Sequence, residues 1–499
     1  MRGTDQPEEQ TPAISAPLGV GVLRAVAWGA GTLAMALIAL VATTDVVDLL
    51  ARLVSQFPAP YGRLGIAFTA AYTIGGAGLL VAAWRLGGWP GVRSWLLPVG
   101  IVLVAVGVRY ILAALVDAPL TGENRIIHQQ ALGVLDGGSC CFGQRPMGYP
   151  LVLAGVYGLL GSGFGAVETL NIACAAATTW LVFDIGRVAW DRRVGALAAM
   201  AFAIIPSQVL MTLPPLTEPL YTVLVAGTVR LVIATPSRPL VAAAMVGVAV
   251  AGAQYVRATA VSLLAPIVVL PLLVGAGLRR SMSGAAMTVA AFVVAVLPVI
   301  SFNLEAHGDL SVSTSAYAGW SLFVGANQAS AGRWNPDDAA LFSAFPGESA
   351  WEKSEHAGGL ALERIFDDPG GYLELQPRKF VIVWGDESYA AAYALAPAGE
   401  PVSREVRVGW LVSQLFYAPF LLLALIAMLS EWRRPRPAVL LIGMIVSLVV
   451  VTHLFVEAHS RYHTYLIPLL VVLAAGGVNA LVRYLRGVWS AAAQARRAA

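Results

Sequence analysis

The amino-acid sequence predicts an all-α, polytopic membrane protein, and three observations lead to this prediction. Of the 499 residues, 58% are hydrophobic and only 12% are charged, a composition foreign to soluble globular chains of this size. Many apolar runs approach twenty residues, the length a helix needs to cross a hydrocarbon core of roughly 30 Å. Basic residues gather in alternate connections between these runs, as cytoplasmic connections do.

Twelve apolar runs are predicted to form transmembrane helices, each of sufficient or nearly sufficient length. They are residues 22–43, 64–84, 95–116, 166–186, 193–211, 217–235, 239–256, 259–277, 283–303, 408–430, 437–456 and 463–484. The run 149–160 is too short to cross, and we expect it to form a helix that lies at the membrane interface or dips into it.

The arginines predict the topology. They fall in connections of one parity and in the C-terminal tail: Arg85, Arg93, Arg187, Arg192, Arg193, Arg230, Arg238, Arg279, Arg280, Arg433, Arg434, Arg436, Arg483, Arg486, Arg496 and Arg497. With an even number of spans, both termini are then cytoplasmic. Cysteines introduced at Ser354 and Ser237 are accordingly expected on opposite sides of the membrane.

This topology divides the chain into five parts. Residues 1–20 are predicted to be a disordered cytoplasmic tail, since no basic region leads to a signal-peptide cleavage site. A membrane domain, 21–303, contains a first extracytoplasmic loop, 117–148. An extracytoplasmic segment, 304–407, precedes the C-terminal membrane helices, 408–485, and a cytoplasmic tail, 486–499.

Cysteine content, repeats and overall composition exclude some classes of membrane protein and indicate the kind of membrane. Cys140, Cys141 and Cys174 are too few for a disulfide framework or a zinc site; a vicinal disulfide between the first two remains open. No repeat of 20–50 residues is visible, which weighs against transporter folds. High Ala, Gly, Val and Arg usage indicates a GC-rich bacterial genome, and therefore the bacterial cytoplasmic membrane.

The first long polar interruption in the chain runs from Asp117 to Pro150. It contains Asp117, Glu123, Asp136, Arg125, His128 and Arg145. Carboxylates beside cations at the mouth of a membrane helix bundle favour a functional site. A solvated loop with ordinary charges is the alternative interpretation.

Spacing favours the functional interpretation. Glu123 is followed by Ala131 eight residues later, by Gly137, and then by Arg145-Pro146-Met147-Gly148-Tyr149-Pro150. This pattern resembles the first extracytoplasmic loop of GT-C membrane glycosyltransferases, which include the protein O-mannosyltransferases of glycosyltransferase family 39 and the aminoarabinose transferases acting on lipid A. It departs from that loop in having Glu for Asp at position 123, Ile127 for Tyr and Met147 for Pro.

The resemblance implies roles for residues of this loop. Glu123 becomes the catalytic base, and Arg145 and Tyr149 become substrate contacts. Asp117 is the rival catalytic carboxylate, although its spacing to Ala131 and Gly137 does not fit.

Two further polar points lie at the outer ends of predicted spans. Glu218 precedes Pro219 at a helix start, where an acid can simply offset the helix dipole, or it lines the substrate site. Arg257 stands between two apolar runs, where it can snorkel to the interface or, as the resemblance implies, contact the donor phosphate.

The last outer turn, residues 457–463, resembles the GT-C signature that precedes the final span. Here the resemblance implies that Arg461, assisted by His463, binds phosphate and that Glu457 contacts substrate. The alternative is a structural Glu457–Arg461 ion pair at i,i+4 spacing.

Together these features predict a GT-C-like enzyme that transfers a sugar from a polyprenyl-phosphate donor to an extracytoplasmic glycan, lipid or protein, with inversion implied by the family. The sequence contains no Gly-rich nucleotide loop, no metal-ligand spacing and no feature of nucleic-acid binding. It leaves a divalent-metal requirement open. The alternatives are a lipid-linked sugar transporter or flippase, which should carry ionisable groups at mid-membrane depth, and an inactive GT-C-like scaffold.

Overall fold

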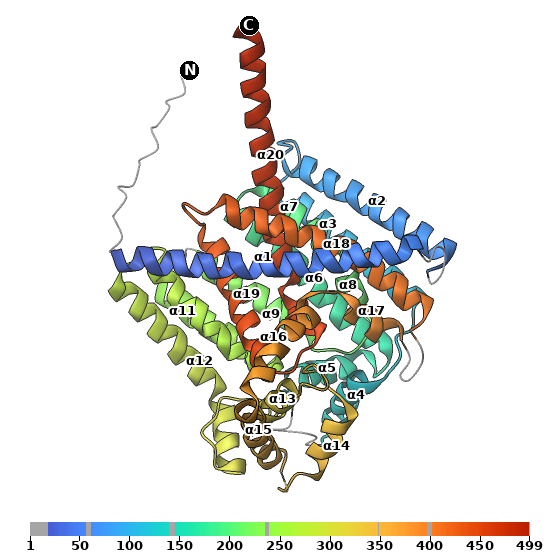
Figure 1. Cartoon of the computed structure of the whole chain (residues 1–499), viewed down its shortest axis with the longest axis vertical. Helices are drawn as coiled ribbons and strands as arrows, with labels where there is room; N and C mark the ends of the chain where they lie inside the picture. Colours follow the sequence, from blue (N-terminus) through green and yellow to red (C-terminus); the bar gives the residue numbers. More distant parts are fainter. Residues whose placement is uncertain are drawn as a thin grey trace.

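The computed structural model describes residues 18–55, 61–138, 145–234, 239–347, 349–396 and 402–498. Within these ranges every regular element is a helix (Figure 1), which confirms the predicted all-α fold class. Most of the predicted N-terminal tail, as well as Cys140, Cys141 and Ser237, lies outside the described residues.

In the described chain, nine helices are long and apolar enough to cross a membrane, and each overlaps a predicted span. They are α1 (Leu18–Ser55), α2 (Gly62–Gly87), α3 (Leu96–Leu115), α6 (Phe164–Ala189), α10 (Pro239–Val256), α12 (Leu278–His307), α18 (Arg404–Ser430), α19 (Pro437–Phe455), and α20 (Ile467–Ala498) together with the 3-10 helix η2 (Ser460–Leu466) that leads into it. The protein is therefore a multi-pass membrane protein.

The three other predicted spans are shorter or interrupted helices, so the count of twelve is not confirmed. The run 193–211 is divided into α7 (Arg192–Ile204) and α8 (Pro206–Leu210) because Pro206 lacks a backbone donor and clashes with the preceding turn. The run 217–235 forms α9 (Glu218–Ile233), and the run 259–277 forms the 3-10 helix η1 (Ala258–Leu263) followed by α11 (Leu264–Leu273).

Arg109 explains how the break between α7 and α8 is tolerated inside the bundle. This fully buried side chain of α3 donates to the carbonyl oxygens of Ala203 (2.9 Å), Phe202 (3.5 Å) and Gln208 (3.3 Å). Backbone carbonyls freed at a helix break need a partner where water is excluded. Arg109 is thus an ionisable residue within a span, but all its described hydrogen bonds are donated to backbone carbonyl oxygens.

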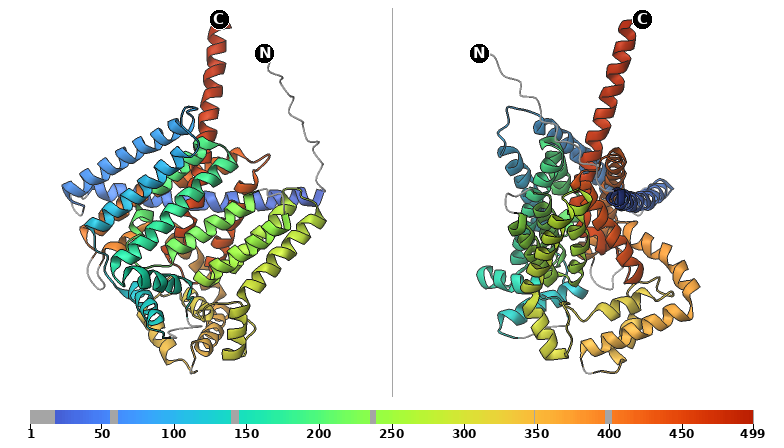
Figure 2. Two further views of the ribbon diagram at one scale, coloured as in Figure 1. Left: turned by 180° about the vertical axis from the view of Figure 1, so that it is seen from behind. Right: turned by 90° about the vertical axis from the view of Figure 1, so that its left-hand side faces the viewer.

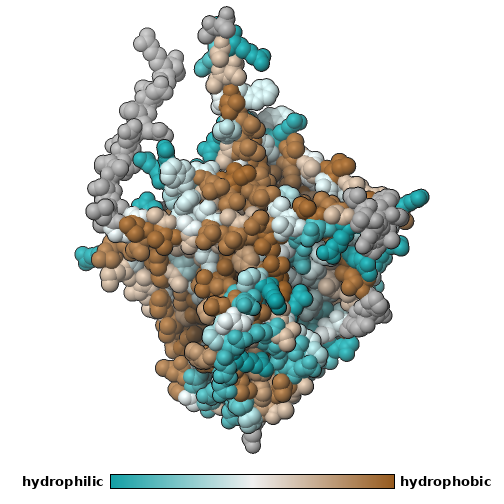
Figure 3. Space-filling view, viewed as in Figure 1, coloured by the Kyte–Doolittle hydropathy of each residue, from teal (hydrophilic) through white to brown (hydrophobic). Residues whose placement is uncertain are grey.

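The spanning helices pack as one bundle with an apolar exterior. Helix α18 packs against α20, and α6 packs against α7 and α9. Helix α1, drawn in blue, lies across the bundle in contact with α18 and α19 (Figures 1 and 2). Figure 3 shows apolar surface on the flanks and polar surface over the end of the molecule farthest from the C terminus.

The two predicted outer segments meet at that polar end. The segment 117–148 contains a helix, α4 (Gly122–Leu135), and is followed by α5 (Gly148–Leu160), the short helix predicted from its length. Both lie at the same end of the molecule as the helices of the segment 304–407, opposite the C-terminal end of α20 (Figures 1 and 2).

The segment 304–407 has a small core of its own. Its helices are α13 (Ala318–Gly325), α14 (Pro336–Ala344), α15 (Ala350–Asp367), α16 (Pro369–Trp384) and α17 (Ser388–Leu395). A separate apolar cluster is built around Trp320, Phe323 and Tyr372. Helix α15 ends before Pro369, because a proline disfavours the helical conformation of the residue that precedes it.

Topology can be tested with single cysteines at Ser343 and Ser490, both exposed, in a variant whose three native cysteines are serine. Ser354 is unsuitable because it is buried and accepts a hydrogen bond from Gly319 N–H. We expect a membrane-impermeant thiol reagent to label Ser343→Cys from outside whole cells and Ser490→Cys only after the membrane is opened. Labelling of both from one side would contradict the arginine-based topology.

Candidate functional site

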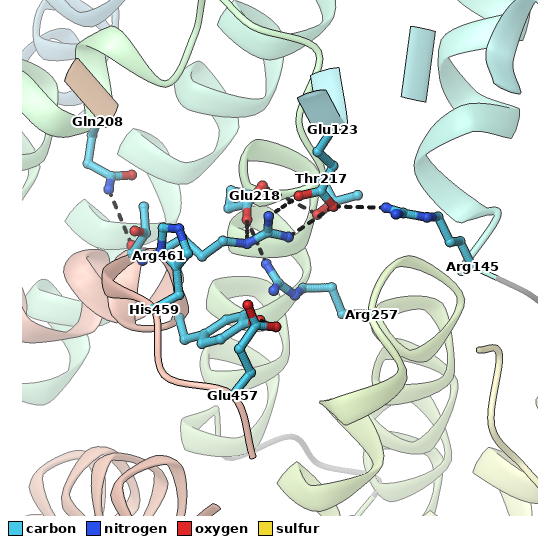
Figure 4. A network of polar contacts seen from close by, with 11 residues as sticks. Glu123, Arg145, Gln208, Thr217, Glu218, Arg257, Glu457, His459 and Arg461 are labelled. Atoms are coloured by element: carbon cyan, nitrogen blue, oxygen red, sulfur yellow. Dashed lines mark hydrogen bonds and ion pairs between the residues drawn. The ribbon is translucent and has the colours of Figure 1, made fainter. Parts of the chain in front are cut away.

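The site is centred on an ion pair between α4 and η2. Glu123 lies in the first turn of α4, and Arg461 lies in η2 (Figure 4). The Arg461 guanidinium donates to both carboxylate oxygens: Nη2 lies 3.1 Å from Oε1, and Nη1 contacts Oε2. Arg145 approaches the same carboxylate, with Nη1 3.4 Å from Oε1. A bidentate pair of this kind is both stronger and more directional than a single contact.

A second carboxylate completes the centre. Glu218, the first residue of α9, is almost entirely buried. Its Oε1 accepts a hydrogen bond of 2.8 Å from Arg257 Nη1 and lies 3.2 Å from Arg461 Nε. Arg461 therefore bridges two carboxylates that belong to different helices.

Arginines outnumber carboxylates within the ion-pair network. Glu123 and Glu218 face Arg145, Arg257 and Arg461, an excess of one positive charge among the ion-paired groups; the carboxyl of Glu457, whose pKa is raised by burial, lies beside them and is not in this count. The Arg145 side chain is 28% exposed and that of Arg461 12%. Excess positive charge in a partly open, low-dielectric site favours an anionic ligand.

Tyrosine rings surround the arginines. The Arg461 Cζ lies 5.7 Å from the ring centroids of Tyr389 and Tyr462, and the Arg257 Cζ lies 5.7 Å from those of Tyr221 and Tyr462. Arg145 lies over Tyr317 at 5.1 Å. These rings attract the guanidinium groups electrostatically and limit access of water to them.

Local backbone features position the charged groups. Gly122, with φ of +49°, admits the turn that starts α4, and Asn124 Nδ2 donates to Pro119 O at 3.1 Å. His459 caps η2, since its Nδ1 accepts from the Arg461 backbone N–H at 3.2 Å. Gly148 touches the end of α10, where an added Cβ would come within 2.6 Å of Tyr255 O.

The pKa values follow from this geometry. Burial alone would raise the pKa of Glu123, but the charges of Arg461, Arg145 and Arg257 and the hydrogen bond from Arg461 lower it from 4.5 to about 2. Burial raises the pKa of Glu457, which accepts a hydrogen bond from Tyr462 Oη at 3.0 Å. Burial and the charge of Arg461 lower the pKa of His459 to about 3. Glu123 is thus an anion held by arginine at neutral pH.

Most of the residues predicted for the site come together. Glu123, Arg145, Glu218, Arg257 and Arg461 form the network described above, and Glu457 lies beside it (Figure 4). The alternative Glu457–Arg461 pair is not formed: Arg461 contacts the other two glutamates, and Glu457 bonds to Tyr462.

Three predicted residues lie apart from the network. His463 is fully buried, its ring bonded to Val383 O and, at 2.5 Å, to Glu387. Tyr149 is also buried and donates to Asn171 Oδ1 at 3.0 Å. Asp117 is exposed and has no ion pair among the described residues.

Sequence reasoning missed the contribution of α17. Tyr389 and Tyr393 stand next to Arg461, with their ring centroids 4.4 Å apart. Their spacing of four residues on an alanine-rich helix is the signal that was available, because such residues share one face.

A small cavity lies beside Glu218. Its volume is only about 20 Å³, and apolar side chains such as Phe202 and Met211 line it together with polar ones such as Asn171 and Gln208. No group of three or more His, Cys, Asp or Glu side chains able to hold a metal ion occurs in the described chain.

Fold and site together define a multi-pass helical membrane protein with a centre of excess positive charge at one end. Residues 144–303 match the sequence model of the family described as dolichyl-phosphate-mannose-protein mannosyltransferase. The match confirms, over this segment, the predicted resemblance to GT-C membrane glycosyltransferases. It includes Arg145, Glu218 and Arg257, whereas Glu123 and Arg461 lie outside it. Comparison with curated proteins gave no match.

Solved structures with a similar chain trace were also found. The apo oligosaccharyltransferase of Archaeoglobus fulgidus has a TM-score of 0.49 at 11% identity, covering 81% of this chain and 52% of that one. ArnT of Cupriavidus metallidurans bound to undecaprenyl phosphate has a TM-score of 0.38 at 14% identity, covering 77% and 78%. The chain thus spans about half the length of the archaeal enzyme.

The low pKa of Glu123 predicts a pH dependence. Because the pKa is lowered on folding, the ion pair stabilises the fold above about pH 4.5 and loses this effect as the pH falls towards 2. The thermal unfolding midpoint of the detergent-solubilised protein should therefore decrease from pH 5 to pH 3, with a smaller slope in Glu123→Gln. Asp117→Asn, which removes an exposed carboxylate, should keep the wild-type slope. An unchanged slope in Glu123→Gln would contradict the assignment.

Proposed function

We propose that this protein is a membrane glycosyltransferase that transfers a sugar from a polyprenyl-phosphate donor to a hydroxyl group of a glycan, lipid or protein outside the bacterial cytoplasmic membrane. The proposal is carried by the bridging position of Arg461 between Glu123 and Glu218. A guanidinium that forks around a carboxylate offers the same geometry to a phosphate. The match of residues 144–303 to a family that uses dolichyl-phosphate mannose supports a lipid-phosphate donor.

In the proposed reaction Glu123 takes the proton of the acceptor hydroxyl, and the acceptor oxygen attacks the anomeric carbon. The bond between that carbon and the phosphate oxygen breaks, and its electron pair leaves with the polyprenyl phosphate. Arg461 and Arg257 stabilise the charge that develops on the leaving phosphate. Displacement in one step inverts the anomeric centre.

Donor binding would also activate the base. In the absence of ligand, Arg461 holds Glu123 at a pKa of about 2, and such a carboxylate is a poor proton acceptor at neutral pH. A donor phosphate that engages Arg461 offsets the positive charge felt by Glu123. The pKa of Glu123 then rises towards a value better suited to general-base catalysis.

The first test is substitution of Glu123. We expect Glu123→Gln to lower kcat by about a hundred- to ten-thousand-fold, the usual contribution of a general base, while donor binding survives. Glu123→Asp keeps the carboxylate with a reach shorter by one methylene, and it should retain part of the activity. The measurement is formation of the glycosylated acceptor by purified protein with a radiolabelled lipid-linked sugar.

Asp117→Asn is the matched control, because it removes a carboxylate six positions earlier in the chain, outside the ion-pair network. Its effect should be milder than that of either Glu123 variant. A Glu123→Gln protein that turns over at nearly the wild-type rate, with an inactive Asp117→Asn protein, would assign the base to Asp117. Movement of lipid-linked sugar without any glycosylated product would favour the transporter alternative.

The second test concerns the phosphate contact. We expect Arg461→Ala to weaken donor use at least about thirtyfold, as follows from losing a charged pair worth 2 kcal/mol or more. Arg461→Lys should restore only part of this, since lysine keeps the charge but lacks the planar fork. Donor KM, kcat and the yield of monodisperse protein are measured together. A parallel loss of yield and activity in both variants would indicate a purely structural residue.

A further inference from the structure

Tyr389 is the second residue of α17 and lies against the charged centre. The residue is only 3% exposed. Its ring centroid lies 5.0 Å from that of His459 in an edge-on arrangement, 4.4 Å from that of Tyr393, and 5.7 Å from the Arg461 Cζ. The aromatic ring is therefore well packed.

The hydroxyl group of Tyr389 has no hydrogen-bond partner among the described residues. Other buried tyrosines do have one: Tyr149 donates to Asn171, Tyr417 to Trp384 O at 3.2 Å, and Tyr372 to Leu454 O at 2.9 Å. A buried hydroxyl without a partner is unfavourable, because the group has lost its bonds to water and gained none in return. Such groups are rare enough in folded proteins that each calls for an explanation.

The surroundings of the hydroxyl indicate what kind of partner it takes. Arg461, Glu218 and Glu123 all act electrostatically on the phenol. Arg461 can only donate, and both carboxylates are engaged by arginines. Burial raises the pKa of Tyr389 well above 10, so the hydroxyl keeps its proton and acts as a donor. An incoming anion at Arg461 would supply the missing acceptor.

We propose that the Tyr389 hydroxyl donates a hydrogen bond to a phosphate oxygen of the lipid-linked donor, beside Arg461. This inference rests on the proposed function, and it adds a substrate contact from the segment 304–407 to those proposed for Glu123, Arg257 and Arg461. The outer segment then takes part directly in donor recognition.

The test compares Tyr389→Phe with Tyr417→Phe in the full chain in detergent. The probes are a polyprenyl monophosphate and the corresponding polyprenol, which lacks the phosphate. For Tyr389→Phe we expect about ten- to hundredfold weaker binding of the monophosphate, as for loss of a hydrogen bond to a charged group. Its thermal unfolding midpoint should equal or exceed that of the wild type, since no internal hydrogen bond is lost.

Tyr417→Phe removes a buried hydroxyl that has a protein partner. It should lower the unfolding midpoint and leave monophosphate affinity unchanged. If Tyr389→Phe binds the monophosphate as tightly as the wild type, the inference is wrong. It is also wrong if Tyr389→Phe lowers the unfolding midpoint as much as Tyr417→Phe does. If the wild type binds the polyprenyl monophosphate and the polyprenol equally tightly, the proposed phosphate site itself is wrong, and with it the proposed function.

Discussion

The arrangement of this protein depends on one ion-pair network, in which Arg461 bridges Glu123 and Glu218. Glu123 and Arg461 are 338 residues apart in the sequence, so the network forms only when α4, α9 and η2 are all in place. Desolvating three charged groups is unfavourable unless their geometry is good and further hydrogen bonds are made. Arg257 and Arg145 supply those bonds. The ends of several helices are therefore constrained to meet at one point.

The same network also explains how one site can accommodate both the ligand-free state and the proposed donor-bound state. In the ligand-free protein, the carboxylate of Glu123 accepts the hydrogen bonds of the Arg461 guanidinium. In the proposed reaction, a phosphate replaces that carboxylate and accepts these hydrogen bonds instead. Because one anion exchanges for another, neither state leaves Arg461 as a buried, unpaired cation, which would be strongly destabilising. The carboxylate that is released, Glu123, is the one proposed as the base.

Hydropathy and motif spacing predicted much of the fold and the site. Nine spans follow from apolar length, and Glu123, Arg145, Glu218, Arg257 and Arg461 were identified from local patterns. The count of twelve is not confirmed, because Pro206 divides the run 193–211, and the runs 217–235 and 259–277 form helices shorter than the nine spans.

The residues that lie apart from the network, or that the sequence did not indicate, depend on tertiary contacts. His463 lies only two residues from Arg461, yet η2 turns it into the core, where Glu387 binds it and the rings of Trp384 and Tyr417 stack on it. Tyr389 carries no charge and follows a long polar segment. Its spacing from Tyr393 places both rings on one face of α17, but the packing of α17 against η2 is a tertiary contact that this local pattern does not reveal.

The partners of the buried cations distinguish structural from functional roles. Arg109 donates to backbone carbonyls at the break between α7 and α8. Lys379, also fully buried, donates to Gly325 O at 2.9 Å and Leu454 O at 2.8 Å, near the C-terminal ends of α13 and α19. Carbonyls fixed in the backbone cannot be exchanged. Burial lowers the pKa of Lys379 to about 7, so this side chain acts here as a hydrogen-bond donor to helix ends rather than as a permanent charge.

Arg461 differs from both because its partners are side-chain carboxylates and part of its guanidinium is exposed. Side chains can move aside for a ligand anion without unwinding a helix. The Lys379 contacts hold the junction from α19 to the turn that carries Arg461, together with a hydrogen bond of 2.8 Å from Ala458 N–H to Gly332 O. Basic side chains bound to carbonyls at the helix ends thus keep the backbone in position, and Arg461, whose carboxylate partners can be exchanged, is the one proposed to bind the donor phosphate.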